Sequence, residues 1–140
     1  RMTAAGRDEA VERLCRNMQE QGFIDDAEQL TAEALRREAL ASTAVDHGIA
    51  FPHVRGIEGG GLTLALATSR KGVHFGQGRS LTRLMFFMTI PTAASAFYLK
   101  LLSGLCTVLS EKPAREELLQ AEDPETLLKS LSRLTRKAIR

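Results

Sequence analysis

The sequence predicts an α/β fold in which a mixed β-sheet is flanked by helices. Three observations support this prediction. Segments with a helical spacing of apolar residues lie at both ends of the chain, segments with strand character lie between them, and 140 residues is the size of one domain. A chain of this length buries about two-thirds of its unfolded surface, so it needs neither a metal nor a disulfide to fold. We therefore expect a single domain spanning residues 1–140.

Two helices are predicted in the N-terminal third. In residues 8–21 the apolar side chains recur every three or four positions, and Gly22 would end this helix. After a short connector, Asp25 or Asp26 can accept a hydrogen bond from the free N–H groups that begin a second helix. The apolar faces of the two helices consist of Val11, Leu14, Cys15, Met18, Leu30, Ala34 and Leu35.

The strands are predicted in the middle of the chain. Residues 62–69 alternate between leucine and smaller side chains, as a half-buried strand does. Two turns are predicted at 70–72 and 76–78, around a short extended piece. Residues 81–90 are rich in apolar side chains and end at Pro91, so we interpret them as a central strand.

Three helices are predicted in the C-terminal third. Residues 94–109 carry a continuous apolar face, and Lys112-Pro113 begins a short helix after it. In the last helix Asp123 would act as the N-cap and Pro124 would occupy the first turn. This order of strands between helices completes the layered α/β pattern.

Composition excludes several classes of protein. A hydrophobic content of 44% and a charged content of 26% are globular rather than disordered values. A formal net charge of +2 is too small to indicate a nucleic-acid partner. The sequence contains no run of 18 apolar residues, so no membrane span is predicted, and the polar start is unlike a secretory signal. We expect a cytoplasmic location, either as a separate protein or as the cytosolic domain of a larger membrane transporter. Cys15 and Cys106 lack CxxC spacing, and we expect both to pack as small apolar residues in a reducing compartment.

The charges are unevenly distributed. Five basic residues and no acidic ones follow position 128, namely Lys129, Arg133, Arg136, Lys137 and Arg140. They complement the negative end of a helix dipole, or alternatively they form a basic patch for a phosphate or a membrane surface.

Three histidines are the side chains whose pKa ordinarily lies near neutrality: His47, His53 and His74. Their spacing matches no zinc-ligand motif, so no metal site is predicted. We expect His47 and His74 to be surface residues, and we concentrate on His53.

His53 ends the segment that carries chemistry, which reads REALAST at 37–43 and GIAFPH at 48–53. Pro52 restrains the backbone immediately before the imidazole. Arg37 can offer a guanidinium fork to an anion, and Ser42 and Thr43 offer hydroxyls. Together these groups could hold a phosphoryl group on an imidazole nitrogen. The alternatives are a structural loop histidine, a helix-end ion pair for Arg37, and capping or turn roles for the two hydroxyls.

The two runs resemble the signature of enzyme IIA of the phosphoenolpyruvate-dependent phosphotransferase system, of the mannitol, fructose and nitrogen-regulatory type. The resemblance extends from about residue 8 to 134 and implies that family's fold, a mixed sheet flanked by helices. It implies that His53 accepts phosphate from the histidine phosphocarrier protein and passes it to an enzyme IIB. It also implies that Arg37, Ser42 and Thr43 line the phosphate pocket, with no metal or other cofactor.

The chain departs from the family pattern at three places. Tyr98 occupies the position of a second histidine; its phenol can hydrogen-bond a phosphate but cannot become a cation, and plain helix packing is its alternative role. Ala44 and Asp46 replace two loop glycines. Phe51 and Val54 flank the histidine segment with larger side chains, which would form either an apolar docking rim or part of the core.

These features lead to two main hypotheses. The first is a phosphoryl carrier in which His53 is the nucleophile and Arg37, Ser42, Thr43 and Tyr98 bind the phosphate. The second is a regulatory domain of the same fold, phosphorylated slowly or not at all, that controls a transporter, a kinase or another partner. A small-anion binding module without covalent chemistry is a third hypothesis.

Overall fold

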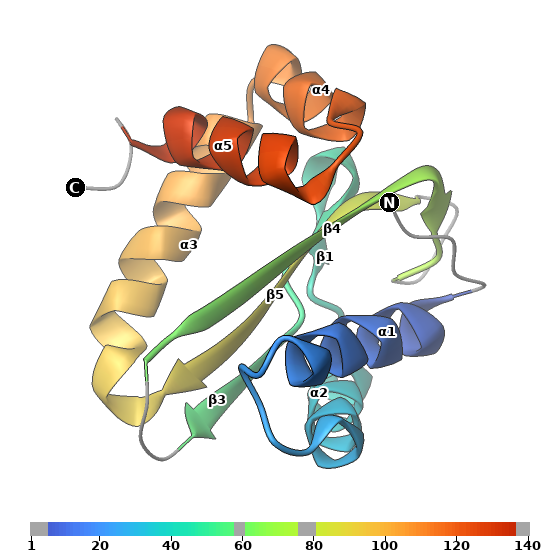
Figure 1. Cartoon of the computed structure of the whole chain (residues 1–140), viewed down its shortest axis with the longest axis vertical. Helices are drawn as coiled ribbons and strands as arrows, with labels where there is room; N and C mark the ends of the chain where they lie inside the picture. Colours follow the sequence, from blue (N-terminus) through green and yellow to red (C-terminus); the bar gives the residue numbers. More distant parts are fainter. Residues whose placement is uncertain (1–5, 58–60, 76–80, 137–140) are drawn as a thin grey trace.

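A β-sheet lies between two groups of helices (Figure 1), in a computed structural model that describes residues 6–57, 61–75 and 81–136. The predicted fold class, a mixed sheet flanked by helices, is confirmed. One face of the sheet is covered by α1 (Arg7–Glu20) and α2 (Ala27–Leu40). The opposite face is covered by α3 (Ser95–Leu109), α4 (Lys112–Gln120) and α5 (Pro124–Thr135).

The sheet is organised around its central strand, β5 (Thr82–Pro91). This strand pairs in parallel with β2 (Ile49–Ala50) and β3 (His53–Ile57), and antiparallel with β4 (Thr63–Val73). The short β1 (Ala44–Val45) adds to β2 in antiparallel orientation. β2 and β3 follow one another along one edge of β5, because they pair with its first and second halves, and β4 occupies the other edge.

Alternation along β5 divides the core into two clusters. Met85 and Phe87 face the cluster formed with α1 and α2, whereas Leu84, Phe86, Met88 and Ile90 face the cluster formed with the last three helices. Successive side chains of a strand point to opposite faces, so a strand buried on both faces must be apolar throughout. This explains why the segment predicted as a central strand shows no polar alternation.

The predicted starts of α1 to α5 and the predicted end of α1 are reproduced to within about one residue, whereas α2 continues to Leu40, beyond the predicted apolar face that ends at Leu35. Gly22 adopts φ +82° directly after α1, a conformation that glycine adopts without strain. The carboxylate of Asp26 accepts a hydrogen bond from the N–H of Gln29, and that of Asp123 accepts one from Thr126. Both aspartates are therefore the N-caps that the sequence indicates.

The predicted turn at 70–72 is wrong, because β4 continues through it to Val73. The pairing of β4 with β5 shifts register between Thr68 and Val73, and the Ser69 hydroxyl oxygen accepts a hydrogen bond from the Gly72 N–H. The turn-forming residues thus build a β-bulge inside one long strand. The predicted turn at 76–78 lies outside the described residues.

α3 differs from expectation in two ways. The segment Thr92–Leu109 is long and apolar enough, by length and composition, to cross a membrane, although the sequence has no uninterrupted run of 18 apolar residues. One such helix is weak evidence of a span, and here Leu105 and Leu109 pack into the second core. Cys106 is exposed on this helix, so of the two cysteines only Cys15 is a core residue.

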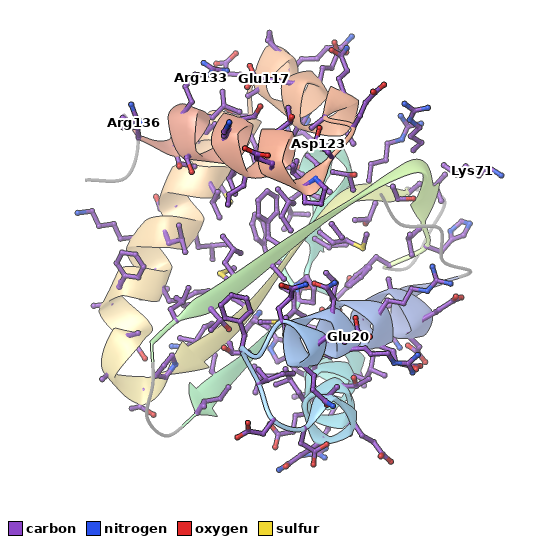
Figure 2. All side chains as sticks on the ribbon, viewed as in Figure 1. Glu20, Lys71, Glu117, Asp123, Arg133 and Arg136 are labelled. Atoms are coloured by element: carbon purple, nitrogen blue, oxygen red, sulfur yellow. The ribbon has the colours of Figure 1, made fainter. Side chains whose placement is uncertain are left out.

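The basic residues of α5 are partly neutralised by neighbours. Arg133 pairs with Glu117 of α4, and the two side chains meet at the top of Figure 2. Lys129 lies 3.1 Å from the Glu125 carboxylate on its own helix. Within the described residues these pairs favour a solvated helix end over a basic patch; Lys137 and Arg140 lie outside that range.

Candidate functional site

A cleft of about 1000 Å³ opens beside His53, between α2 and β3. Arg37 and Arg36 line it from α2, and Arg55 lines it from β3. The connector before α2 contributes Phe23, Ile24, Asp25 and Asp26. The lining of the cleft therefore combines the predicted nucleophile with three arginines and two aspartates.

His53 is the first residue of β3 and is fixed at both backbone and side chain. Its Cα pairs with Met88 of β5, and the Pro52 carbonyl accepts a hydrogen bond from the Met88 N–H. The imidazole is 7% exposed, and its Nδ1 lies 2.8 Å from the carbonyl oxygen of Phe51. A carbonyl can only accept, so Nδ1 carries the hydrogen and the lone pair of the neutral ring is on Nε2.

The surroundings of His53 favour this neutral form. Burial is the main effect that lowers the pKa of His53, and the charges of Arg37 and Arg55 lower it further. The hydrogen bond to the Phe51 carbonyl and the charge of Glu38 act in the opposite direction. The net result is a pKa below its usual value of 6.5, so the imidazole can act as a nucleophile at neutral pH.

Arg37 lies in the last turn of α2. Its Nη1 donates a hydrogen bond to the Ala41 carbonyl oxygen at 3.0 Å, which ties the guanidinium to the start of the following loop. Among the described residues Arg37 has no acidic partner, so its remaining N–H groups can serve an anion.

Thr43 is turned away from the cleft and toward a buried carboxylate. Its N–H donates to Glu38 Oε2 at 3.0 Å, and its hydroxyl donates to the other Glu38 oxygen. The Thr43 carbonyl in turn accepts a hydrogen bond from the Phe51 N–H. Glu38 is 3% exposed, so this arrangement locks the loop after α2 to the strand that leads to His53.

Ser42 is exposed, and its Oγ accepts a hydrogen bond from the Ala44 N–H at 3.1 Å. The hydroxyl hydrogen has no partner among the described residues and can still donate. In this structure neither Ser42 nor Thr43 is among the described residues that line the cleft.

Tyr98 packs against His53 from the start of α3. The centres of the two rings are 5.6 Å apart, with 38° between their planes. Burial is the main effect that raises the pKa of the Tyr98 phenol, so the group is uncharged at neutral pH. Tyr98 is 5% exposed and belongs to the second core, and it therefore combines packing with proximity to the imidazole.

Two residues of the site were missed by the sequence analysis. Arg55 lies two positions after His53 on a strand, and Cζ of its guanidinium is 5.3 Å from the centre of the Tyr98 ring. Strand alternation was the signal that could have found it. Glu38 follows the predicted Arg37, but nothing in the sequence indicated that its carboxylate would be buried.

Other predicted features lie away from the site or in the core. Phe51 and Val54 are buried in the two core clusters, which favours the core alternative over a docking rim. His47 and His74 are exposed, as predicted. Over the described ranges, no cluster of three or more His, Cys, Asp or Glu side chains could hold a metal ion.

Comparisons of the sequence with known proteins identify one protein family. A sequence model of the family described as "Phosphoenolpyruvate-dependent sugar phosphotransferase system, EIIA 2" matches residues 1–134. The fructose-specific EIIA component of Haloferax volcanii is 32% identical over 124 residues, which are 88% of this chain and 80% of that protein. The 2-O-alpha-mannosyl-D-glycerate-specific EIIABC component of Escherichia coli is 30% identical, and the match covers 89% of this chain but 20% of that protein.

Two solved structures of enzyme IIA proteins have the same fold as this chain. The nitrogen regulatory protein IIA-Ntr from Neisseria meningitidis superposes with a TM-score of 0.81 at 25% identity, over 93% of this chain and 89% of that one. Mannitol enzyme IIA of Escherichia coli, solved in complex with phosphorylated mannitol enzyme IIB, shares the fold with a TM-score of 0.74 at 18% identity, over 94% and 90% of the two chains.

Proposed function

The chain belongs to the EIIA 2 family of the phosphoenolpyruvate-dependent sugar phosphotransferase system, and from that premise we propose that His53 is its phosphoryl-accepting residue. The phosphate would come from the histidine phosphocarrier protein and would be passed on to an enzyme IIB. We propose further that residues 1–140 act as one domain and that the exchange takes place in the cytoplasm. The observation that carries the proposal is the hydrogen bond from His53 Nδ1 to the Phe51 carbonyl, which leaves Nε2 as the free nucleophile.

Transfer on this geometry requires no proton movement at His53. The lone pair of Nε2 attacks the phosphorus, the new Nε2–P bond forms, and the N–P bond of the donor phosphohistidine breaks with its electron pair returning to the donor ring. The hydrogen on Nδ1 stays in place throughout. Its bond to the Phe51 carbonyl supports the positive character that the phosphorylated ring acquires. Positioning and charge stabilisation are then the main contributions of the protein.

The predicted phosphate-binding residues have different parts in this proposal. Arg37 would bind phosphoryl oxygens with the N–H groups that its bond to Ala41 leaves free. Ser42 would donate its hydroxyl hydrogen, and the Tyr98 phenol, being uncharged, would act only as a hydrogen-bonding or packing group. Thr43 would act through Glu38, by holding the loop, because both of its donors are already in use.

The regulatory alternative draws no support from the comparisons, and phosphotransfer separates it from the proposal. The protein is incubated with phosphoenolpyruvate, enzyme I and the histidine phosphocarrier protein, and acid-labile, base-stable phosphate is measured. We expect the wild type to take up phosphate, His53→Ala to take up none, and the exposed control His74→Ala to match the wild type.

Two results would contradict the proposal. If the wild type takes up no phosphate while a known enzyme IIA is labelled under the same conditions, the carrier function is wrong and a regulatory domain is favoured. If His53→Ala is still labelled, the assignment of the accepting residue is wrong.

A further inference from the structure

Arg55 is a cation beside His53 to which the transfer described above assigns no task. It follows His53 by two positions on β3, so the two side chains leave the strand on the same side. Both meet Tyr98 of α3: the imidazole centre lies 5.6 Å from the phenol ring centre, and the Arg55 Cζ lies 5.3 Å from it. His53 and Arg55, both on β3, therefore contact the same aromatic ring, that of Tyr98 on α3.

The guanidinium of Arg55 is available to a ligand. Arg55 is exposed and lines the same cleft as His53 and Arg37. Within the described part of the chain its side chain forms no ion pair and donates no hydrogen bond; its contact is with the face of the Tyr98 ring. A guanidinium that lies over an aromatic ring can keep its edge N–H groups free to donate, while the contact limits where the group can move.

The charge requirement of the site points to this residue. A phosphoryl group on Nε2 carries about two negative charges at neutral pH. Arg37 has one N–H engaged with Ala41, and Tyr98 is a neutral phenol that cannot supply a charge. The positive character of the phosphorylated ring offsets only part of the dianion, and Arg55 is already close enough that its charge acts on His53, so it can supply a second guanidinium to the phosphoryl oxygens.

Resting on the proposed function, we infer that Arg55, positioned by the Tyr98 ring, binds the phosphoryl group on His53 together with Arg37. Arg55 donates its N–H groups to phosphoryl oxygens in both the transition state and the phosphorylated protein. Tyr98 is the positioning residue, since it acts by holding the guanidinium and not by carrying charge. The step itself is the one balanced above, and Arg55 neither gains nor loses a proton in it.

The first experiment removes the charge of Arg55. Phosphate uptake from the phosphocarrier protein is compared for wild type, Arg55→Gln and Arg83→Gln. Arg83 is a matched control because it is an exposed arginine on strand β5 that does not line the cleft, and the variant loses the same charge. We expect Arg55→Gln to lower the uptake rate about tenfold, the effect of one charge-assisted hydrogen bond, while the control stays within about twofold. Arg55→Lys should recover part of the loss, because it restores charge without the planar fork.

The second experiment tests whether the Tyr98 ring positions Arg55. Tyr98→Phe keeps the ring and should leave the effect of Arg55→Gln intact, whereas in a Tyr98→Leu background the same substitution should have a smaller effect. The pKa of His53, followed by NMR in the unphosphorylated protein, should rise in Arg55→Gln, because a cation that opposes ring protonation has been removed. This pKa change shows whether the charge of Arg55 reaches His53, and the uptake rate shows whether that charge serves the phosphoryl group.

The outcomes separate the inference from the function on which it rests. If the wild type is labelled and Arg55→Gln matches its uptake rate, the role of Arg55 is wrong and the carrier function stands, whatever the His53 pKa does. If the effects of Arg55→Gln and Tyr98→Leu simply add, Tyr98 does not position Arg55. If the wild type itself is not labelled, the carrier function fails, and the role of Arg55 fails with it.

Discussion

The substitution Thr43→Val tests the interpretation that Thr43 holds the loop before His53 through Glu38. Valine has nearly the same shape as threonine but lacks the hydroxyl that donates to the Glu38 carboxylate. The backbone N–H of residue 43 would still donate to the other carboxylate oxygen. The variant therefore leaves one oxygen of a side chain that is 3% exposed without its donor.

The expected loss follows from that burial. A hydrogen bond to a charged group contributes about 1.5–3 kcal/mol, and a buried acceptor left unpaired retains its desolvation cost. We expect the free energy of unfolding to fall by about 2 kcal/mol, with a fall in melting temperature of roughly 6–10 °C for a domain of this size. Urea denaturation, followed by circular dichroism at neutral pH, measures the change.

Two control variants sharpen this result. Thr107→Val removes a hydroxyl that donates to the Ser103 carbonyl on the exposed face of α3, and it should change stability by no more than about 0.5 kcal/mol. Thr43→Ser keeps the donor and should recover most of the loss. The reasoning is refuted if Thr43→Val is as stable as the wild type, or if Thr43→Ser is as unstable as Thr43→Val.

Three further predictions concern the fold and its response to pH. Burial holds the pKa of folded His53 below its unfolded value of 6.5, so the stability linked to the neutral imidazole is complete above pH 6.5 and is lost as the pH falls toward the folded pKa. Urea denaturation across this range should show that the free energy of unfolding declines, and that it declines less in His53→Gln. His47 adopts φ +70°, so His47→Gly should stabilise the fold by roughly 0.5–1 kcal/mol in the same assay, and an unchanged or lower stability would contradict the strain. Phe86 is fully buried on β5, so Phe86→Ala should cost about 3–5 kcal/mol, and a loss below about 1 kcal/mol would show that this layer is not tightly packed.

Much of the fold was predictable because it depends on local patterns. The spacing of apolar residues located the helices, and the apolar run that includes Phe86 and Phe87 located the central strand. The end of β4 was missed, because Arg70-Lys71-Gly72 has the composition of a turn and only pairing with β5 reveals a bulge. Local sequence does not show which turn-like segments are drawn into a sheet.

The site residues that lie within one sequence motif were predictable, whereas those that only the folded chain brings together were not. His53 and Arg37 come from two adjacent runs, and the structure places both on one cleft. Arg55 gains its position from Tyr98, which is more than 40 residues later in the chain. The hydrogen bonds from Thr43 to Glu38 depend on the path of the loop after α2. The residue types in that loop do not determine its path.

The central claim is that Nε2 of His53 accepts the phosphoryl group while Nδ1 keeps its hydrogen. The most direct measurement is NMR of the protein with ¹⁵N-labelled histidine, after phosphorylation by phosphoenolpyruvate, enzyme I and the phosphocarrier protein. We predict phosphorus–nitrogen coupling at Nε2 of His53 and a hydrogen retained on Nδ1, bonded to the Phe51 carbonyl. Coupling at Nδ1, coupling at His47 or His74, or a His53 ring that is unchanged after full labelling would contradict the account.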